Sequence, residues 1–497
     1  MLDKRACGVL LHPTSLPGPG GIGSLGKDAR RFVDLLASME VAYWQVLPLA
    51  PPACGNSPYS AFSAFAGNPL LIDLDQFTED GDLPDINYEN CSNDTCVDFE
   101  AVSEMKMKLL RTAGTNFLNE AAPLKQEFWD FCNSTLWLHN YALFMALKLR
   151  YKGKSWEKWP AGAALLTPEK YEKYSVELGP EIGVQKYIQW QFFRQWRGLR
   201  TYAAGKGIKI IGDIPIFVGY DSADVWSNRE LFLLDPKGKP TVVAGVPPDY
   251  FSSTGQLWGN PLYDWDAMKS RNYAWWIERF QYMFELFDVI RIDHFRGFES
   301  AWQVRTGEKT AVNGTWIKAP GEELFDTVLA ALGKLPVIAE DLGVITPEVT
   351  ALRDRYDFPG MKIVQFAFDS GPSNAYLPHN HEKKSVVYTG THDNNTTAGW
   401  YDSLSEQQRS RVNYYVGGRG KDTVECILRT VLMSVADTVI IPLQDLFQLG
   451  SEARMNIPGT AFGNWGWRFT WNMVSSDLSG HLRDQLECYG RCNPRCR

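Results

Sequence analysis

The chain has 497 residues, and 50 Lys and Arg against 58 Asp and Glu give it a formal net charge of −8. Apolar residues make up 44% and charged residues 22%, a balance that is typical of a folded globular protein and excludes a disordered or collagen-like chain. The acidic balance argues against nucleic acid or an anionic membrane as a partner, because both favour a basic surface. The length fits about three domains or one decorated barrel.

Aromatic residues are numerous, with 18 Trp, 21 Tyr and 26 Phe making up 13% of the chain. Aromatic side chains fill large cores, and this explains most of them. They also line grooves that bind flat apolar ligand surfaces. Composition alone leaves both interpretations open.

The N-terminal apolar piece is too short for a signal-peptide core, and no stretch reaches the roughly 18–20 apolar residues of a membrane span. There are nine cysteines, and the C-terminal trio Cys488, Cys492 and Cys496 has neither the spacing nor the nearby His of a zinc site. We therefore expect free thiols, no metal and a reducing cytoplasm.

Eight short β-branched runs alternate with helical patterns. They cover 42–50, 68–75, 208–216, 288–294, 336–341, 361–366, 385–393 and 437–445. Such runs indicate a parallel sheet covered by helices on both faces. Eight units predict an α/β fold of the closed (β/α)8 TIM-barrel type, whereas six or seven would favour an open sheet.

We interpret residues 1–497 as one catalytic barrel with two insertions. Residues 76–206 are rich in helical pattern and too long for an ordinary crossover, which predicts an inserted, mostly helical subdomain. Residues 217–270 are rich in Pro, Gly, Tyr and Trp and have little helical periodicity. We expect them to form a loop-rich insertion over the active-site mouth, where the loops after barrel strands lie.

Acidic residues end three of the predicted strands, namely Asp293, Glu340 and Asp393. A single acid at such a place is often a helix cap, but three acids whose strand ends meet in one barrel mouth form a more specific pattern. Paired carboxylates that stabilise an oxocarbenium-like transition state are typical of glycosidic-bond chemistry. Arg291 should share a strand face with Asp293 and lower the pKa of that carboxyl, which would keep it ionised.

Nine longer motifs carry a resemblance to a known family. They are GVLLHPTSLPGPGGIGSLG, SPYSAFSAFAGNPLLI, GDIPIFVGYDSADVW, GVPPDYFSSTGQLWGNPLYDW, IRIDHFRGF, AEDLG, PGMKIVQFAF, YTGTHDNNTTAGW and GTAFGNWGWR. In these the sequence resembles, nearly end to end, the 4-α-glucanotransferases (amylomaltases or disproportionating enzymes) of glycoside hydrolase family 77 in the α-amylase clan.

The resemblance implies a retaining transfer of α-1,4-glucan segments to the 4-hydroxyl of a second glucan or of glucose, with cyclisation to large rings as a further outcome. Asp293 would be the nucleophile that forms a β-linked glycosyl-enzyme, and Glu340 the general acid and then the base. Asp393 would hold the 2- and 3-hydroxyls of the sugar at the cleavage point. Retention predicts about 5–5.5 Å between the carboxyls of Asp293 and Glu340. The resemblance implies no cofactor and no metal.

The resemblance also implies a set of substrate-binding residues. They are Tyr59, Asp213, Asp249, Tyr250, Phe251, Gln256, Trp258, Arg291, His294, Phe366, His392 and Asn464. Tyr59 would stack on the sugar at the cleavage point, and the aromatic residues of 247–265 would stack on further sugars, although a lid that packs its own aromatics is the alternative. Trp465 and Trp467 are equally compatible with the core and with the site.

One departure from the family pattern is Asn395, where many relatives have Asp, and it puts only a secondary contact in doubt. The implied partners are maltooligosaccharides, amylose, starch or glycogen fragments, and glucose, in the cytoplasm or, for a mature plant form, the plastid stroma. Two other functions are compatible with parts of the pattern. A hydrolase of the same clan would share the three acids but is not expected to have the 245–261 motif. A catalytically inactive glucan-binding scaffold is disfavoured by the intact acids.

Overall fold

The computed structural model describes residues 4–53, 55–86, 88, 94–119, 124–248, 252–493 and 495. Eight strands form one sheet in the order β10-β11-β12-β1-β2-β3-β6-β9, and all neighbouring strands in this order run parallel. The strands are β1 (Ala6–Leu10), β2 (Tyr43–Gln45), β3 (Lys209–Pro215), β6 (Val289–Asp293), β9 (Val337–Ala339), β10 (Gly360–Ile363), β11 (Ser385–Tyr388) and β12 (Thr438–Pro442).

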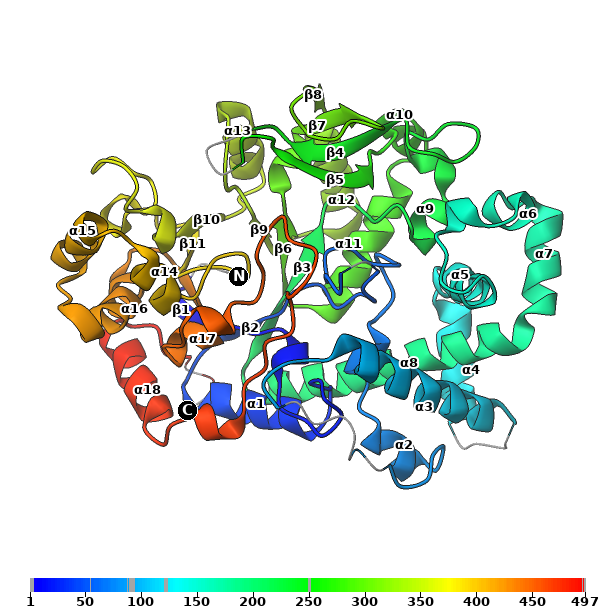
Figure 1. Ribbon diagram of the computed structural model, residues 1–497, viewed down its shortest axis with the longest axis horizontal. Helices are drawn as coiled ribbons and strands as arrows, with labels where there is room; N and C mark the ends of the chain where they lie inside the picture. The colour runs from blue at the N-terminus through cyan, green and yellow to red at the C-terminus, as the bar shows by residue number, and fades with distance from the viewer. Residues whose placement is uncertain are drawn as a thin grey trace.

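The two end strands of this order come together and nearly close the sheet into a barrel. The backbone amide of Ala339 in β9 donates to the carbonyl of Pro359, directly before β10, at 3.0 Å. Strands β1, β11 and β12 are buried along their whole length, as expected where helices cover a parallel sheet. The predicted TIM barrel is confirmed (Figure 1).

Helices surround the barrel and pack their apolar faces on it. In α1 (Lys27–Ser38) the buried residues Ala29, Phe32, Val33 and Leu36 recur at helical spacing. The helices that follow strands or flank the barrel are α8 (Gly179–Gly205), α11 (Ala274–Leu286), α12 (Gly321–Leu332), α13 (Pro347–Arg355), α14 (Thr397–Ser403), α15 (Glu406–Val416), α16 (Thr423–Met433), α17 (Leu443–Leu446) and α18 (Leu478–Cys488).

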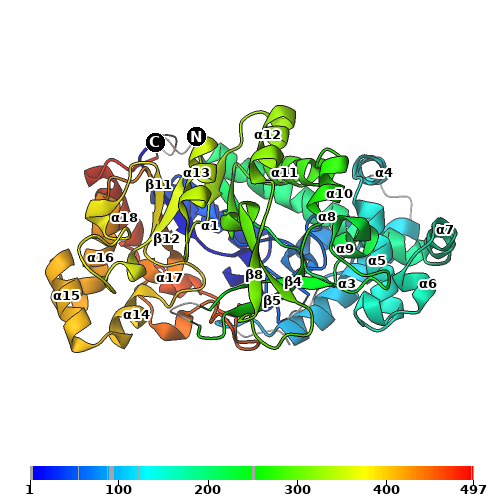
Figure 2. The ribbon, with the colours of Figure 1, turned by 90° about the horizontal axis from the view of Figure 1, so that it is seen from above.

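A group of helices precedes β3 and lies to one side of the barrel (Figures 1 and 2). It contains α2 (Asp75–Asp80), α3 (Phe99–Asn119), α4 (Lys125–Ser134), α5 (Leu138–Arg150), α6 (Ala161–Ala164) and α7 (Pro168–Glu177). Helix α8 links this group to the barrel, because its fully buried Trp196 donates from the indole to the carbonyl of Leu286 in α11 at 3.2 Å.

One of the eight predicted strands is wrong. Residues 68–75 form the 3-10 helix η2 (Pro69–Leu71) and the start of α2, because Pro69 lacks an amide hydrogen and the Asn68 side chain caps the turn by accepting from the amide of Leu70. The eighth strand is instead β1, which the sequence interpretation missed because five residues near the chain start have no periodic pattern. The predicted strand number was therefore right for a partly wrong reason.

A second sheet stands beside the barrel and was not predicted. Its four antiparallel strands have the order β5-β4-β7-β8. They are β4 (Val242–Val246), β5 (Gln256–Pro261), β7 (Ser300–Arg305) and β8 (Gly314–Lys318), accompanied by the short helices α9 (Ala223–Ser227) and α10 (Trp265–Ser270). Because these strands follow barrel strands β3 and β6, the sheet lies at the carboxyl-end mouth of the barrel (Figure 1).

None of the helices in the described ranges is long and apolar enough to cross a membrane. Within the same ranges, no group of three or more His, Cys, Asp and Glu side chains is placed to hold a metal ion.

Candidate active site

Three charged side chains from two neighbouring barrel strands form the centre of the mouth. In the register of β3 and β6, Asp213 lies opposite Arg291 and Pro215 opposite Asp293. The Arg291 guanidinium bridges the two acids, with 2.7 Å from Nη1 to Asp213 Oδ2 and 3.0 Å from Nη2 to Asp293 Oδ1. Arg291 and Asp213 are buried, whereas the Asp293 side chain keeps 31% of its surface exposed. Asp293 is therefore the member of this group that an incoming ligand reaches.

Glu340 follows the next strand, β9, and backbone amides hold its carboxylate. The amide of His294 donates to Oε2 at 2.7 Å, and the amide of Leu342 donates to Oε1 at 2.9 Å. His294 follows Asp293 directly and adopts the left-handed conformation with φ 53°, which turns its amide toward Glu340. The chain itself thus links the two carboxylates.

The two carboxyls differ in pKa because their surroundings differ. Burial raises the pKa of Asp293 to about 6, and the nearby Arg291 charge opposes this rise. Burial, followed by the negative charge of Asp293, raises the pKa of Glu340 to about 7. Arg291 lowers the pKa of Asp293, as expected, but burial outweighs this effect, so the net pKa is raised. At neutral pH Asp293 is still the more ionised of the two.

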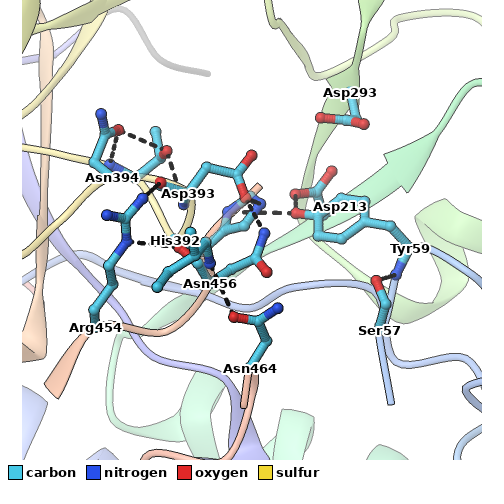
Figure 3. A network of polar contacts seen from close by, with 12 residues as sticks. Ser57, Tyr59, Asp213, Asp293, His392, Asp393, Asn394, Arg454, Asn456 and Asn464 are labelled. Atoms are coloured by element: carbon cyan, nitrogen blue, oxygen red, sulfur yellow. Dashed lines mark hydrogen bonds and ion pairs between the residues drawn. The ribbon is translucent and has the colours of Figure 1, made fainter. Parts of the chain in front are cut away.

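Asp393 lies on the loop after β11, and its side chain is 49% exposed. Its carboxylate accepts from Asn456 Nδ2 at 2.7 Å and lies 3.4 Å from His392 Nε2, while its carbonyl accepts from Arg454 Nη2 at 2.7 Å (Figure 3). Asn456 and Arg454 were not predicted, since they belong to an irregular segment after β12 with no pattern to mark it. Their hydrogen bonds to the carboxylate and the carbonyl of Asp393 hold this residue in position.

Tyr59 and His392 form a ring pair at the side of the mouth. Their rings stack at 4.9 Å with an interplanar angle of 16°, and the Tyr59 hydroxyl donates to Asp213 Oδ2 at 2.7 Å (Figure 3). Burial and then the Asp213 charge raise the pKa of Tyr59 well above its usual value, which keeps the hydroxyl a donor. Trp465 and Trp467 are both buried in the core, and the ring of Trp465 also lies 5.8 Å from His392 and 6.0 Å from Tyr59. Trp465 thus borders the site.

Trp258 approaches the mouth from the second sheet. Its indole meets the imidazole of His294 edge to face at 4.8 Å and donates to Gln256 Oε1 at 3.0 Å. Burial, followed by the Arg296 charge, lowers the pKa of His294 to about 3, so the ring is neutral. Trp258 is 38% exposed and is available for further contacts.

The remaining predicted site residues are less centrally engaged. Phe366, in the turn after β10, packs edge to face on Tyr376 at 5.6 Å. Asn464 donates to the carbonyl of Thr460 and accepts from the amide of Ile457, so its amide group braces its own loop. Asp249, Tyr250 and Phe251 lie outside the described residues.

Comparison with known proteins gives one consistent result. A family model described as 4-alpha-glucanotransferase matches residues 11–474. The 4-alpha-glucanotransferase of Synechocystis sp. is 49% identical over 99% of both chains, and that of Thermus thermophilus is 46% identical over 98% of this chain and 99% of the relative. The chloroplastic/amyloplastic enzyme of Arabidopsis thaliana is 44% identical over 98% of this chain and 86% of its own.

Among solved structures, the amylomaltase from Streptococcus agalactiae in complex with acarbose superposes with a TM-score of 0.96. It is 40% identical and is matched over 99% of this chain and 100% of its own. The family model, the relatives and the solved structure each match nearly the whole chain, and the matched part includes Asp293, Glu340 and Asp393. The chain therefore belongs to the 4-alpha-glucanotransferases of glycoside hydrolase family 77.

Proposed function

We propose that Asp293 is the nucleophile and Glu340 the acid–base group with which this 4-alpha-glucanotransferase moves α-1,4-glucan segments. The observation that carries the proposal is the pair of adjacent carboxyls in opposite surroundings. Asp293 faces a guanidinium, whereas Glu340 is held by amides, and the pKa of Glu340 is the higher one. Groups whose pKa values are separated in this way divide into nucleophile and proton donor.

In the first step a carboxylate oxygen of Asp293 attacks the anomeric carbon of the donor. The bond from that carbon to the glycosidic oxygen breaks, and the proton of Glu340 passes to the leaving oxygen. In the second step the 4-hydroxyl of an acceptor gives its proton to Glu340, and its oxygen displaces the Asp293 ester. Two displacements restore the α configuration, and the separation of about 5–5.5 Å between the carboxyls stays a prediction.

The other polar groups would bind the sugar at the cleavage point. Asp393, which Asn456 and Arg454 brace, offers an exposed carboxylate to ring hydroxyls. Tyr59, fixed between Asp213 and His392, offers a rigid ring for stacking. Glucose and α-1,4-glucans would be the acceptors. The compartment would be the cytoplasm or, for a mature plant form, the plastid stroma; the Arabidopsis thaliana relative is named chloroplastic/amyloplastic.

Incubation with maltotriose tests the proposed activity. Transfer gives glucose and a ladder of longer oligomers with no net gain of reducing ends, whereas hydrolysis increases reducing ends in proportion to turnover. Chromatography of the products and a reducing-end assay on the same samples separate the two. A steady rise in reducing ends without a ladder would contradict the transferase assignment.

The pKa values predict a narrow pH optimum. Catalysis needs Asp293 ionised and Glu340 protonated, so kcat/KM should fall below pH of about 6 and again above pH of about 7. Initial rates of glucose release from maltotriose across this range measure both limbs. In Glu340→Gln the alkaline limb should disappear from the residual activity. A wild-type rate that stays constant on the alkaline side would contradict the assignment of Glu340.

Trp258→Ala should shift the balance from transfer toward hydrolysis. The indole covers His294, next to Asp293, and its loss opens the glycosyl-enzyme to water and weakens acceptor binding. We expect the ratio of hydrolysis to transfer to rise several-fold, measured as reducing ends gained per glucose transferred. Trp258→Phe keeps an aromatic ring and should stay close to the wild type. An unchanged ratio in Trp258→Ala would show that Trp258 does not shield the glycosyl-enzyme from water.

A further inference from the structure

The outer strand of the second sheet carries an exposed aromatic side chain that the active site does not use. Strand β8 is the edge of the order β5-β4-β7-β8 and lies outermost from the barrel (Figure 1). On it Trp316 is 38% exposed, and the neighbouring Ile317 is 44% exposed. Because successive residues of a strand face opposite sides of the sheet, these two exposed groups are separate, and Trp316 is the aromatic one that can stack on a ligand.

Trp316 is held rigidly in place. The guanidinium carbon of Arg296 lies 3.7 Å from the centre of its ring, so Arg296 stacks on the indole. The Trp302 ring meets it edge to face at 5.2 Å and is itself fixed by a 2.8 Å hydrogen bond to the carbonyl of Ala311. A Cβ at Gly314 would lie 2.4 Å from the Trp302 indole, so only glycine lets that ring lie flat there. A ligand that stacks on Trp316 would therefore lose little binding free energy to the ordering of this side chain.

The support of Trp316 comes from the two catalytic segments. Arg296 belongs to the turn η5 (Phe295–Phe298) that follows Asp293, and it is buried. Its guanidinium donates to the carbonyl of Val344, in the segment that begins with Glu340, and lies 3.5 Å from the Ser300 hydroxyl. Trp316 thus stands on the rim of the same mouth, beside the segments that hold both carboxyls.

We propose that Trp316 is an outlying sugar-stacking site for long α-1,4-glucans whose reactive part lies between Asp293 and Glu340. The occupant follows from the chemistry of the substrate: a glucan is uncharged, and its ring faces present C–H groups that pack on an indole. Three strand spacings separate β8 from β5, about 14 Å. We therefore expect long glucans, and not short ones, to reach Trp316 while their reactive part lies in the active site.

The test uses Trp316→Ala in the full chain with maltotriose, maltoheptaose and amylose as donors. A lost stacking contact should raise KM for amylose about three- to ten-fold, and KM for maltotriose much less, with a smaller effect on kcat. Trp316→Phe keeps a ring over Arg296 and should restore most of the lost affinity for amylose. Trp129→Ala is the matched control, since this indole is 48% exposed on α4, in the helical group, and both KM values should then be unchanged.

The inference rests on the proposed function, and its failure is distinguishable from failure of that function. A wild type that does not disproportionate maltotriose contradicts the proposed function. An active wild type with KM changes that are equal for short and long donors in Trp316→Ala overturns this inference. Two more results overturn it. If Trp316→Ala lowers the melting temperature and the change in KM does not depend on donor length, Trp316 serves packing. If Trp316→Ala changes only the mass in analytical ultracentrifugation, Trp316 contacts a second copy of the chain.

Discussion

Replacing Asp293 by Asn is expected to lower kcat for transfer by on the order of 10⁴- to 10⁶-fold, as loss of a catalytic nucleophile does in other enzymes. The amide keeps the shape of the side chain but cannot form the glycosyl ester. It also removes one negative charge beside Arg291, whose other partner, Asp213, is retained at 2.7 Å. The fold should therefore persist, and single-turnover assays with maltotriose measure the loss.

A donor with an activated leaving group separates the nucleophile from the acid. Glu340→Gln should lose about 10²- to 10⁴-fold with maltotriose, because the leaving sugar needs a proton. With α-maltosyl fluoride it should recover much of the first step, since fluoride leaves without protonation. Asp293→Asn should stay inactive with both donors. Equal recovery of the two variants on the fluoride would contradict the division of roles.

The position of the acids was predictable because the geometry of a barrel fixes where the end of each strand lies. Each parallel strand ends at the same mouth, so an acid at the end of a strand marks the mouth whatever the loops do. Asp213 and Arg291 lie in register on adjacent strands, and Glu340 follows the next one. Asn456 and Arg454, which hydrogen-bond to Asp393 and hold it in place, could not be predicted. Their contacts depend on the path of an irregular segment, which has no periodicity.

The fold was predicted in its main sheet and missed in the second. A parallel barrel strand is read from a buried apolar run, which is a local signal, and even that failed at 68–75. The second sheet pairs residues near 242–246 with residues near 300–305, on either side of barrel strand β6. No local pattern reports such pairing. Its consequence for the site is large, because the sheet carries both Trp258 and Trp316.

The electrostatics of the site were the least predictable part. Sequence spacing correctly placed Arg291 near Asp293, but the sign of the net shift depends on how much water each carboxyl loses. The burial of each carboxyl depends on how several helices and strands pack together, so the sequence of one element does not predict it. Burial also explains why the pKa of Glu340 is raised to about 7.

The second large effect is expected for Arg291→Met, in both stability and activity. Arg291 is the buried cation between Asp213 and Asp293, and its removal leaves two carboxylates close together without compensation. Breaking a buried ion pair from one side costs about 3–5 kcal/mol, and urea unfolding of the variant should show a loss of that size. The pKa of Asp293 should rise further, because the Arg291 charge, the largest of the effects that oppose burial, is gone. The acid limb of the activity profile should then move to higher pH.

The double variant Arg291→Met/Asp213→Asn separates the charge effect from a general loss of packing. Neutralising Asp213 removes one of the two stranded carboxylates, so the double variant should regain part of the lost stability and shift the acid limb back toward the wild type. It should not regain full activity, because the Tyr59 hydroxyl then faces an amide in place of its carboxylate partner and Asp293 still lacks its cation. If the double variant is as unstable as the sum of the single losses, the two sites are independent. The bridging role of Arg291 is then wrong, and the residue acts by filling space beside Met361.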